Sequence, residues 1–549
     1  MTKEYRLEDH ASQATFQLER REFMRRTGLL TASLALPLGL LPSTPAQADT
    51  TTPTATPVDE AKLAPVAKPS SDIVQMDAVD LANAIRTKAV SCKDVMSAYL
   101  AQIERLNPKF NAIVSLQDRE LLLKQAEDKD QELAAGTYHG WLHGMPQAPK
   151  DLANTVGIPT TQGSPILKNN LPKTDAIIVE RARRAGAILI GKTNTPEFGL
   201  GSHTYNTVFG TTLNAYDPTR SAGGSSGGAA VAVALHMLPV ADGSDMMGSL
   251  RNPAGWNNVF GFRPSQGRVP FGPTGEVFYQ QLGYEGPMGR TVSDLAWLLS
   301  VQAGHDARAP LSIDQDPSIF TQTLKRDFKD VRIGWLGDFK GYLPMEAGVM
   351  DVCKTALKTF ETIGCKVEEV QPDYPMEKLW LTWLTLRGFL IAGIAGPLYN
   401  KPELRAQMKP EAIWEVENGL KLSGAQVWQA SADRTAWYMA LNKLFQTYDY
   451  LVLPTAQVFP FNAQEHWPKT IAGKSMDTYH RWMEVVIPGT LSGLPTIAVP
   501  AGFGGADQLP MGLQIMGKAQ ADLAVLQLAY AYEQASDWIR QKRPAVLLA

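Results

Sequence analysis

The sequence predicts an α/β protein, with a mixed, mostly parallel central β-sheet flanked by helices in a single large α/β/α domain. From residue 72 onward, short apolar runs typical of buried strands alternate with longer amphipathic segments typical of helices. No internal repeat and no second linker divides this part of the chain. The 549 residues, 44% of them hydrophobic, are enough to build a large core. We therefore expect one domain over residues 72–549.

The N-terminus resembles a twin-arginine export signal over residues 1–48. Arg20 and Arg21 precede an apolar run at 29–41, and Ala46-Gln47-Ala48 fits a cleavage site. This pattern predicts a mature chain that begins near Asp49 and is periplasmic or secreted, with the twin-arginine translocation machinery as its partner during export.

The same apolar run also bears on membrane insertion. It is short and is interrupted by Pro37 and Gly39, so we expect no stable insertion. An uncleaved anchor or an amphipathic tail is the alternative. Residues 49–71 are rich in Thr, Pro, Ala and Lys, which predicts a disordered linker.

Periodicity places the elements of the domain in order. Ser91 is the predicted cap of the second helix. The segment 376–399 is apolar and aromatic, and is either core or the roof of a pocket. The predicted helices cover 77–88, 93–105, 119–135, 174–184, 290–303, 348–362 and 521–534. The predicted strands cover 111–116, 187–190, 238–241, 259–272 with a turn, 330–335, 366–370, 450–453, 496–500 and 513–516.

The stretch 221–254 carries two serine-bearing, glycine-rich turns around a short apolar helix. The first turn is 223–228, the buried helix follows at 229–237, and the second turn is expected at 242–249. Serines on such turns face a substrate while the scaffold behind them stays rigid, which favours nucleophilic catalysis.

Charge and cysteine content exclude some functions. With 52 basic and 55 acidic residues, the net charge of -3 offers no basic surplus for nucleic acid. No Cys/His spacing indicates a metal site. Cys92, Cys353 and Cys365 are expected to be buried small side chains, the last two at opposite ends of one helix.

Two motif matches compete with each other. Residues 186–193 fit the phosphate-loop pattern G-x-x-x-x-G-K-T, but their middle is an apolar strand rather than a loop, so Lys192 is expected to be structural. Residues 224–228 fit the nucleophile elbow G-x-S-x-G of α/β hydrolases, with Ser226 as nucleophile. An esterase of that kind needs a downstream histidine, and His305, His466 and His480 lack a recognisable catalytic setting.

Several ordered motifs resemble those of the amidase signature family. They cover nearly all of the expected mature chain: 140–151 (G-x-L-H-G-M-P-x-x-x-K-D), 191–194, 223–228 (GGSSGG), 243–254, 286–295, 493–500 and 510–514. The resemblance implies the amidase signature fold.

The resemblance also implies a Ser-cisSer-Lys triad. Ser249 would be the nucleophile, Ser225 the bridging serine on a cis peptide, and Lys150 the base. A lysine with the ordinary pKa of about 10.4 is protonated at neutral pH, so Lys150 must be desolvated to act as a base. Its apolar neighbours in 145–149 are consistent with a dry pocket.

The backbone amides of Met246, Met247, Gly248 and Ser249 would hold the oxyanion. Met247 stands where the family pattern has a glycine, and a positive φ at this position would strain it. Asp245 and Arg251 are interpreted as buried scaffold of the same turn.

The predicted activity is that of an exported serine hydrolase. It would cleave small-molecule, linear, non-peptide amides through an acyl-enzyme on Ser249, giving a carboxylic acid and ammonia or an amine, with no metal and no cofactor. The export signal argues against the tRNA amidotransferase enzymes of the same family. A non-catalytic amide-binding protein, its oxyanion hole closed by Met247, is the alternative of a different class.

Overall fold

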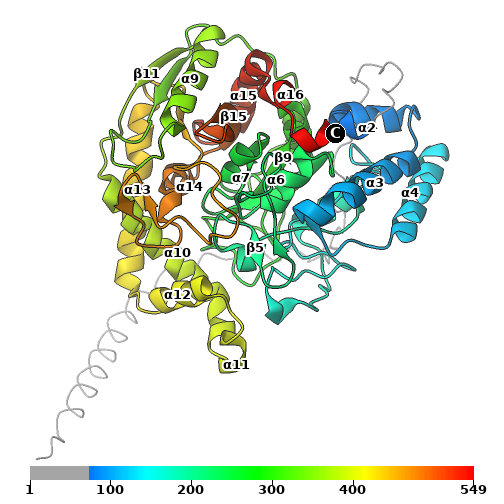
Figure 1. Cartoon of the computed structure of the whole chain (residues 1–549), viewed down its shortest axis with the longest axis horizontal. Coiled ribbons are helices and arrows are strands. Elements are labelled where there is room, and N and C mark those ends of the chain that lie inside the picture. Colours follow the sequence, from blue (N-terminus) through cyan, green and yellow to red (C-terminus); the bar gives the residue numbers. More distant parts are fainter. Residues whose placement is uncertain (1–72, 549) are drawn as a thin grey trace, which may run out of the picture. The chain divides into compact units, whose positions relative to one another are not determined.

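An eight-stranded sheet organises the computed structural model, which describes residues 73–548 (Figure 1). The predicted export signal and linker lie outside the described residues. The strand order across the sheet is β11-β10-β12-β16-β15-β8-β9-β7. These strands are β7 (Val240–Asp245), β8 (Phe260–Arg263), β9 (Tyr284–Gly289), β10 (Arg332–Trp335), β11 (Lys366–Glu369), β12 (Tyr450–Pro454), β15 (Thr496–Gly504) and β16 (Leu509–Met516).

The strand directions confirm a mixed sheet but correct its predicted character. Only β10 pairs in parallel, with β11 and β12, among the described strands of this sheet. The pairings of β16 with β12 and β15, of β8 with β15 and β9, and of β7 with β9 are antiparallel. The expectation of a mostly parallel sheet was therefore wrong. Apolar runs identify strands without giving their direction, and the short turn 505–508 forces β15 and β16 to run antiparallel.

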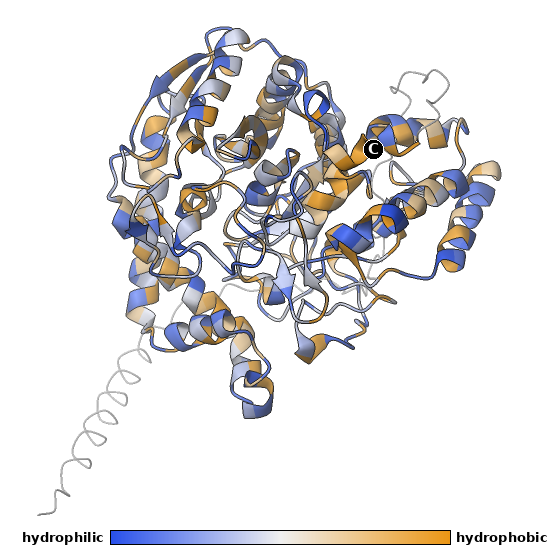
Figure 2. Cartoon of the chain, in the orientation of Figure 1, coloured by the Kyte–Doolittle hydropathy of each residue, from blue (hydrophilic) through white to orange (hydrophobic). Residues whose placement is uncertain are grey.

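Helices cover the sheet, as expected for an α/β domain. On the sheet, α7 packs against β8, β15 and β16, while α9 and α15 pack against β15, and α8 packs against β9. The helices α2 to α4 lie together at one side, and their hydrophilic and hydrophobic positions are interspersed along their length (Figure 2). The bounds of these helices, and of α5 and α6, are α2 (Ala78–Arg86), α3 (Cys92–Phe110), α4 (Arg119–Ala134), α5 (Ile177–Arg184), α6 (Gly227–Ala234), α7 (Arg251–Trp256), α8 (Val292–Gln302), α9 (Val349–Thr362) and α15 (Asp522–Ser536).

Several predicted elements have different bounds. The strand expected at 111–116 contracts to β1 (Ile113–Val114), which pairs with β4 (Lys192–Thr193). The turn expected at 242–249 begins later, because β7 continues to Asp245 in register with β9. The serine-bearing loop therefore spans 246–250, between β7 and α7.

A group of helices next to the sheet contains the apolar segment 376–399, which forms α10 (Met376–Tyr399). It packs against α12 (Pro410–Gly419) and α13 (Gly424–Leu444) (Figure 1). By length and composition α10 is the one described helix that could cross a membrane, but 56% of that window is buried in the fold. The remaining short helices of the chain's second half are α11 (Pro402–Arg405), α14 (Ile487–Ser492) and α16 (Trp538–Gln541).

All three cysteines are buried and unpaired, as expected. Cys353 lies within α9, and Cys365 follows the end of that helix rather than lying in its last turn.

Candidate active site

Lys150 and three serines from distant parts of the chain meet in the interior. The Nζ atom of Lys150 lies 2.7 Å from Ser225 Oγ, 2.9 Å from Ser226 Oγ and 3.0 Å from Ser244 Oγ. Lys150 is positioned by a bridge to Thr193, and its backbone N–H donates to Asp242 Oδ2 at 3.1 Å. The predicted partners Lys150 and Ser225 are thus in direct contact.

The surroundings of Lys150 favour its neutral amine. Burial lowers the pKa of Lys150 to about 7, although the carboxylates of Asp245, Asp242 and Glu285 act in the opposite direction. Glu285 lies opposite Ser244 in the β7–β9 register, so both side chains leave the same face of the sheet. Burial raises the pKa of Glu285 to about 8. The neutral amine of Lys150 is therefore available as a proton acceptor near neutral pH.

Ser249 lies on the loop after β7 and lines the same cavity as Lys150 and Ser225. The side chains of Ser225 and Ser249 are 3% and 6% exposed, so each is accessible only through that cavity. The peptide bond between Gly224 and Ser225 is cis, in agreement with the expectation. Within residues 73–548, no hydrogen bond joins the hydroxyls of Ser225 and Ser249.

Asp245 holds the serine loop in shape. Its carboxylate accepts hydrogen bonds from the backbone of Gly248 at 2.8 Å and Leu250 at 3.2 Å. Arg251 binds the same carboxylate through Nε at 2.9 Å and Nη2 at 3.0 Å, and both side chains are fully buried. Asp245 and Arg251 are therefore scaffold, as predicted.

The oxyanion-hole prediction needs one correction. Since the Gly248 amide already donates to Asp245, it is not free to bind an oxyanion. The amides of Met246, Met247 and Ser249 form no hydrogen bond with any described residue, so they remain available. The loop takes its positive φ, 76°, at Gly248, and Met247 is not among the residues with positive φ. The substitution of methionine for glycine therefore costs no backbone strain.

The competing motifs lack the surroundings that they require. Ser226 is fully buried, and its hydroxyl contacts Lys150 and donates to the Ser244 carbonyl at 3.2 Å, with no histidine among its described partners. Lys192 is in strand β4 and donates to Thr155 Oγ1 at 2.7 Å and to the carbonyl of Ala153. Lys192 therefore has a structural role, as expected.

The cavity has a volume of about 840 Å³ and mostly apolar walls. One wall is α10, which contributes Phe389, Leu390, Ile391, Ile394 and Leu398. Trp380 and Trp383 of the same helix are buried, so α10 is both core and cavity wall.

Glu285, Arg387 and His480 are among the polar lining residues that were missed from the sequence. For Arg387 one signal was available, since it is an arginine within the apolar segment 376–399. His480 was considered from the sequence only as a catalytic partner of Ser226.

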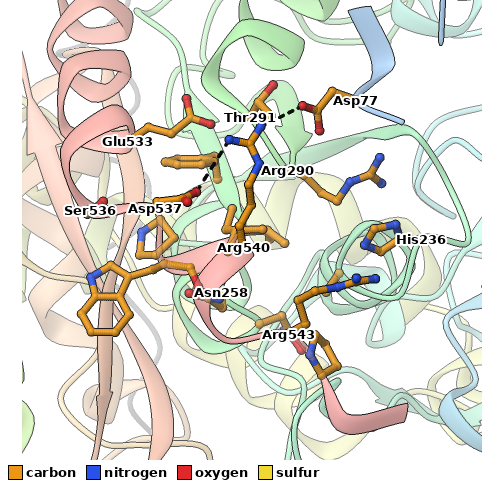
Figure 3. A pocket seen from close by; sticks show the side chains of 18 of the residues that line it. Asp77, His236, Asn258, Arg290, Thr291, Glu533, Ser536, Asp537, Arg540 and Arg543 are labelled. Carbon is orange, nitrogen blue, oxygen red and sulfur yellow. Dashed lines mark hydrogen bonds and ion pairs between the residues drawn. The ribbon is translucent and has the colours of Figure 1, made fainter. Parts of the chain in front are cut away.

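A second cavity, of about 380 Å³, lies between the segment 75–77 and the C-terminal helices (Figure 3). Its charged groups largely pair with each other: Arg540 lies 3.1 Å from Asp77 and 3.8 Å from Asp537. Its lining contains neither lysine nor a serine with a base beside it. Of these two cavities, only the larger one is lined by a lysine in contact with serine hydroxyls.

One group of metal-ligand types, Glu132, His139 and His143, has ligand atoms within 4.8 Å of one another. Both ring nitrogens of His143 already bond the backbone, Nδ1 at 3.2 Å to the His139 amide and Nε2 at 3.0 Å to the Lys129 carbonyl. A metal would have to displace these bonds, and the group does not line the larger cavity.

The fold and this cavity, in which a buried lysine contacts serine hydroxyls, fit a hydrolase. The family model described as Amidase matches residues 94–526, and the chain belongs to that family. It is an amidase, a hydrolase that acts on the carbon–nitrogen bond of amides.

The matches to known proteins cover nearly the whole length of those proteins. The chain is 34% identical over 475 residues to an acylamidase of Rhodococcus erythropolis, and the match covers 86% of this chain and 97% of that protein. It is 32% identical to a glutamyl-tRNA(Gln) amidotransferase polypeptide of Coxiella burnetii, over 85% of this chain and 99% of that protein. The structure of a bacterial aryl acylamidase of the amidase signature family superposes with a TM-score of 0.79 at 30% identity, covering 85% and 97% of the two chains.

Proposed function

We propose that this amidase hydrolyses small apolar carboxylic amides through an acyl-enzyme on Ser249. The observation that carries the proposal is the 2.7 Å contact between Lys150 Nζ and Ser225 Oγ in a buried cavity that also contains Ser249. A serine hydroxyl needs a base to become a nucleophile, and a desolvated lysine meets that requirement.

In the first half of the reaction, Ser249 Oγ bonds to the carbonyl carbon of the amide. Its proton passes to Ser225, which gives its own proton to neutral Lys150. This transfer requires a hydrogen bond between the two serine hydroxyls when substrate binds. The amides of Met246, Met247 and Ser249 then stabilise the oxyanion.

The C–N bond breaks as the proton returns from Lys150 through Ser225 to the leaving nitrogen. This return matters because an amine anion is a poor leaving group. Water then adds to the acyl ester, again giving up its proton toward Lys150. As the bond between Ser249 Oγ and the acyl carbon breaks, this proton returns through Ser225 to Ser249 Oγ, and the carboxylic acid leaves.

The apolar walls favour an aryl or alkyl amide, and the aryl acylamidase and acylamidase among the relatives support the same class. Amidotransferases are among the relatives of similar identity, but an apolar cavity suits a small polar amide poorly. A substrate panel in which small polar amides are turned over much faster than aryl and alkyl amides would contradict the proposal.

We further propose that the protein is exported and acts in the periplasm or outside the cell. The twin-arginine pattern at 20–21 and the A-x-A site at 46–48 support this.

A fluorophosphonate label followed by peptide mapping tests the nucleophile. We expect the label on Ser249, and loss of both label and turnover in Ser249→Ala. A label on Ser226 would instead support the nucleophile-elbow esterase. A protein that takes no label and turns over no amide would support the non-catalytic binding role.

A further inference from the structure

The apolar cavity contains one strongly polar region, formed by Arg387 of α10 and by His480. Both residues line the cavity, and they are only 3% and 2% exposed. Together with Glu415 of α12 and Tyr479 they form a connected group, here called the Arg387 cluster. None of these residues takes part in the reaction steps described above.

One donor nitrogen of Arg387 has only a weak hydrogen-bond acceptor among the described residues. Its Nε atom pairs with Glu415, and Nη2 donates to Tyr479 Oη at 2.8 Å. The third nitrogen, Nη1, faces the thioether sulfur of Met246 at 3.5 Å, which is a weak acceptor. Nη1 is therefore available to a better acceptor inside the cavity.

His480 has a buried ring nitrogen without a hydrogen-bond partner. Its Nδ1 is 2.8 Å from Thr478 Oγ1, whereas Nε2 forms no hydrogen bond with any described residue. Burial, together with the positive charges of Arg387 and Arg481, holds the pKa of His480 well below its ordinary value, so the ring is neutral. The Glu415 carboxylate lies 3.6 Å from Nε2 and favours the tautomer that carries hydrogen there. Leaving such a buried donor unpaired is unfavourable.

The charge of the cluster indicates which ligand group would fit. Glu415 neutralises Arg387, so the pair does not call for a second anion. The donors of the cluster without a strong acceptor are Nη1 of Arg387 and Nε2 of His480, on two residues that line the cavity, and together they match a neutral oxygen with two lone pairs. Met246, which touches Arg387, also contributes an amide to the proposed oxyanion hole, so this oxygen would sit within the substrate-binding part of the cavity.

We propose that the Arg387 cluster is a substrate subsite that binds a carbonyl or ether oxygen carried on the apolar body of the amide, away from the bond that is cleaved. The inference rests on the proposed function, since it names the substrate class of the same cavity. The preferred substrate is then an apolar amide with one additional neutral acceptor oxygen.

Matched amides test the subsite. In each pair a ketone oxygen replaces two hydrogens: 4-oxopentananilide against pentananilide for the acyl part, and the acetamide of 4-amino-2-butanone against N-butylacetamide for the amine part. We expect kcat/KM to favour the ketone about 10-fold or more in one pair, as for a hydrogen bond with a charged donor. The difference should lie mainly in KM, because the contact is made in the ground state as well as in the transition state.

Variants assign the preference to the cluster. In Arg387→Met and His480→Phe the ratio should fall toward 1, whereas His480→Gln, which keeps a donor, should retain most of it. His466→Phe makes the same aromatic exchange at a histidine outside the cavity lining and should leave the ratio unchanged. Circular dichroism of each variant, and the ratio in the conservative variant, separate a lost subsite from a misfolded chain.

Two results would overturn the subsite: a ratio near 1 in both pairs for the unaltered protein, or a preference that survives both Arg387→Met and His480→Phe. Failure of the proposed function would look different, because turnover of the hydrocarbon amides would then persist in Ser249→Ala.

Discussion

In the proposed mechanism, Lys150 sets the pH at which the site can work. Its neutral form accepts the proton, so kcat/KM should rise with pH through an apparent pKa of about 7. Burial raises the pKa of Glu285 to about 8, so this carboxyl is mainly protonated where Lys150 titrates, and Glu285→Gln should leave the rise near pH 7. Initial rates on one anilide from pH 5 to 9 measure both profiles.

The control for this substitution is Glu403→Gln, an exposed carboxylate on α11, which should likewise leave the pH profile in place. A rise displaced to lower pH in Glu285→Gln would show that Glu285 is ionised where Lys150 titrates and raises the pKa of Lys150. If no rise were seen near pH 7 in the unaltered protein, the assignment of Lys150 as the base would be wrong.

Gly248 gives the serine loop its shape. Its φ is 76°, and an added Cβ would lie 2.8 Å from the side chain of Val486. Gly248→Ala should therefore displace the neighbouring oxyanion-hole amides and reduce kcat by about 100-fold, the usual effect of losing one such donor. Gly424→Ala, where a Cβ would meet no atom within 4 Å, is the matched control and should retain full activity. Equal kcat values for the two variants would contradict the role of the loop.

The sequence could predict the residues of the proposed triad better than the residues around them. Lys150, Ser225 and Ser249 each lie in a motif, so their spacing along the chain was informative. Glu285, Arg387 and His480 lie in no motif and reach the cavity from a strand, a helix and a loop that meet only in the folded chain. The use of the Gly248 amide by Asp245 depends on loop geometry, which a motif does not specify.

At the level of elements, α10 and α12 cross at a pair of glycines, Gly388 and Gly419. A Cβ at Gly419 would run into the Gly388 carbonyl and lie 2.6 Å from Ala392 Cβ. Gly419→Ala should push α12 away from α10 and so separate Glu415 from Arg387. We expect KM for apolar amides to rise several-fold with a smaller change in kcat, because the cavity wall moves while the serine loop does not.

The control for the helix crossing is Gly396→Ala on α10 itself, where a Cβ would meet nothing within 4 Å. Its steady-state kinetics should match those of the unaltered protein. A change in kcat alone in Gly419→Ala would show that the crossing supports the serine loop and not the cavity wall.

Element type was easier to predict than element direction or extent. Apolar periodicity identified α9 and the strands β10, β12 and β15, because their burial is visible in the residue pattern, whereas the segment of α10 was predicted only as core or pocket roof. Pairing directions were missed because they depend on how distant segments meet. The late end of β7 at Asp245 was missed for the same reason, since its polar residues are paired with β9 and do not look like a strand.

For the whole molecule, the expected export signal gives a test of processing. Protein isolated from its native host should begin near Asp49, as measured by intact mass and N-terminal sequencing. Replacing Arg20 and Arg21 by lysine should leave the full-length chain inside the cell, whereas Arg25→Lys, outside the paired arginines, should be exported normally. An unprocessed N-terminus on exported protein would support the uncleaved anchor.

The three buried thiols have a consequence for how the protein is made. Since Cys92, Cys353 and Cys365 are unpaired and enclosed by the core, no covalent cross-link contributes to the folded state. The chain can therefore mature in a reducing environment without an oxidant or an isomerase, and millimolar dithiothreitol should leave its activity intact.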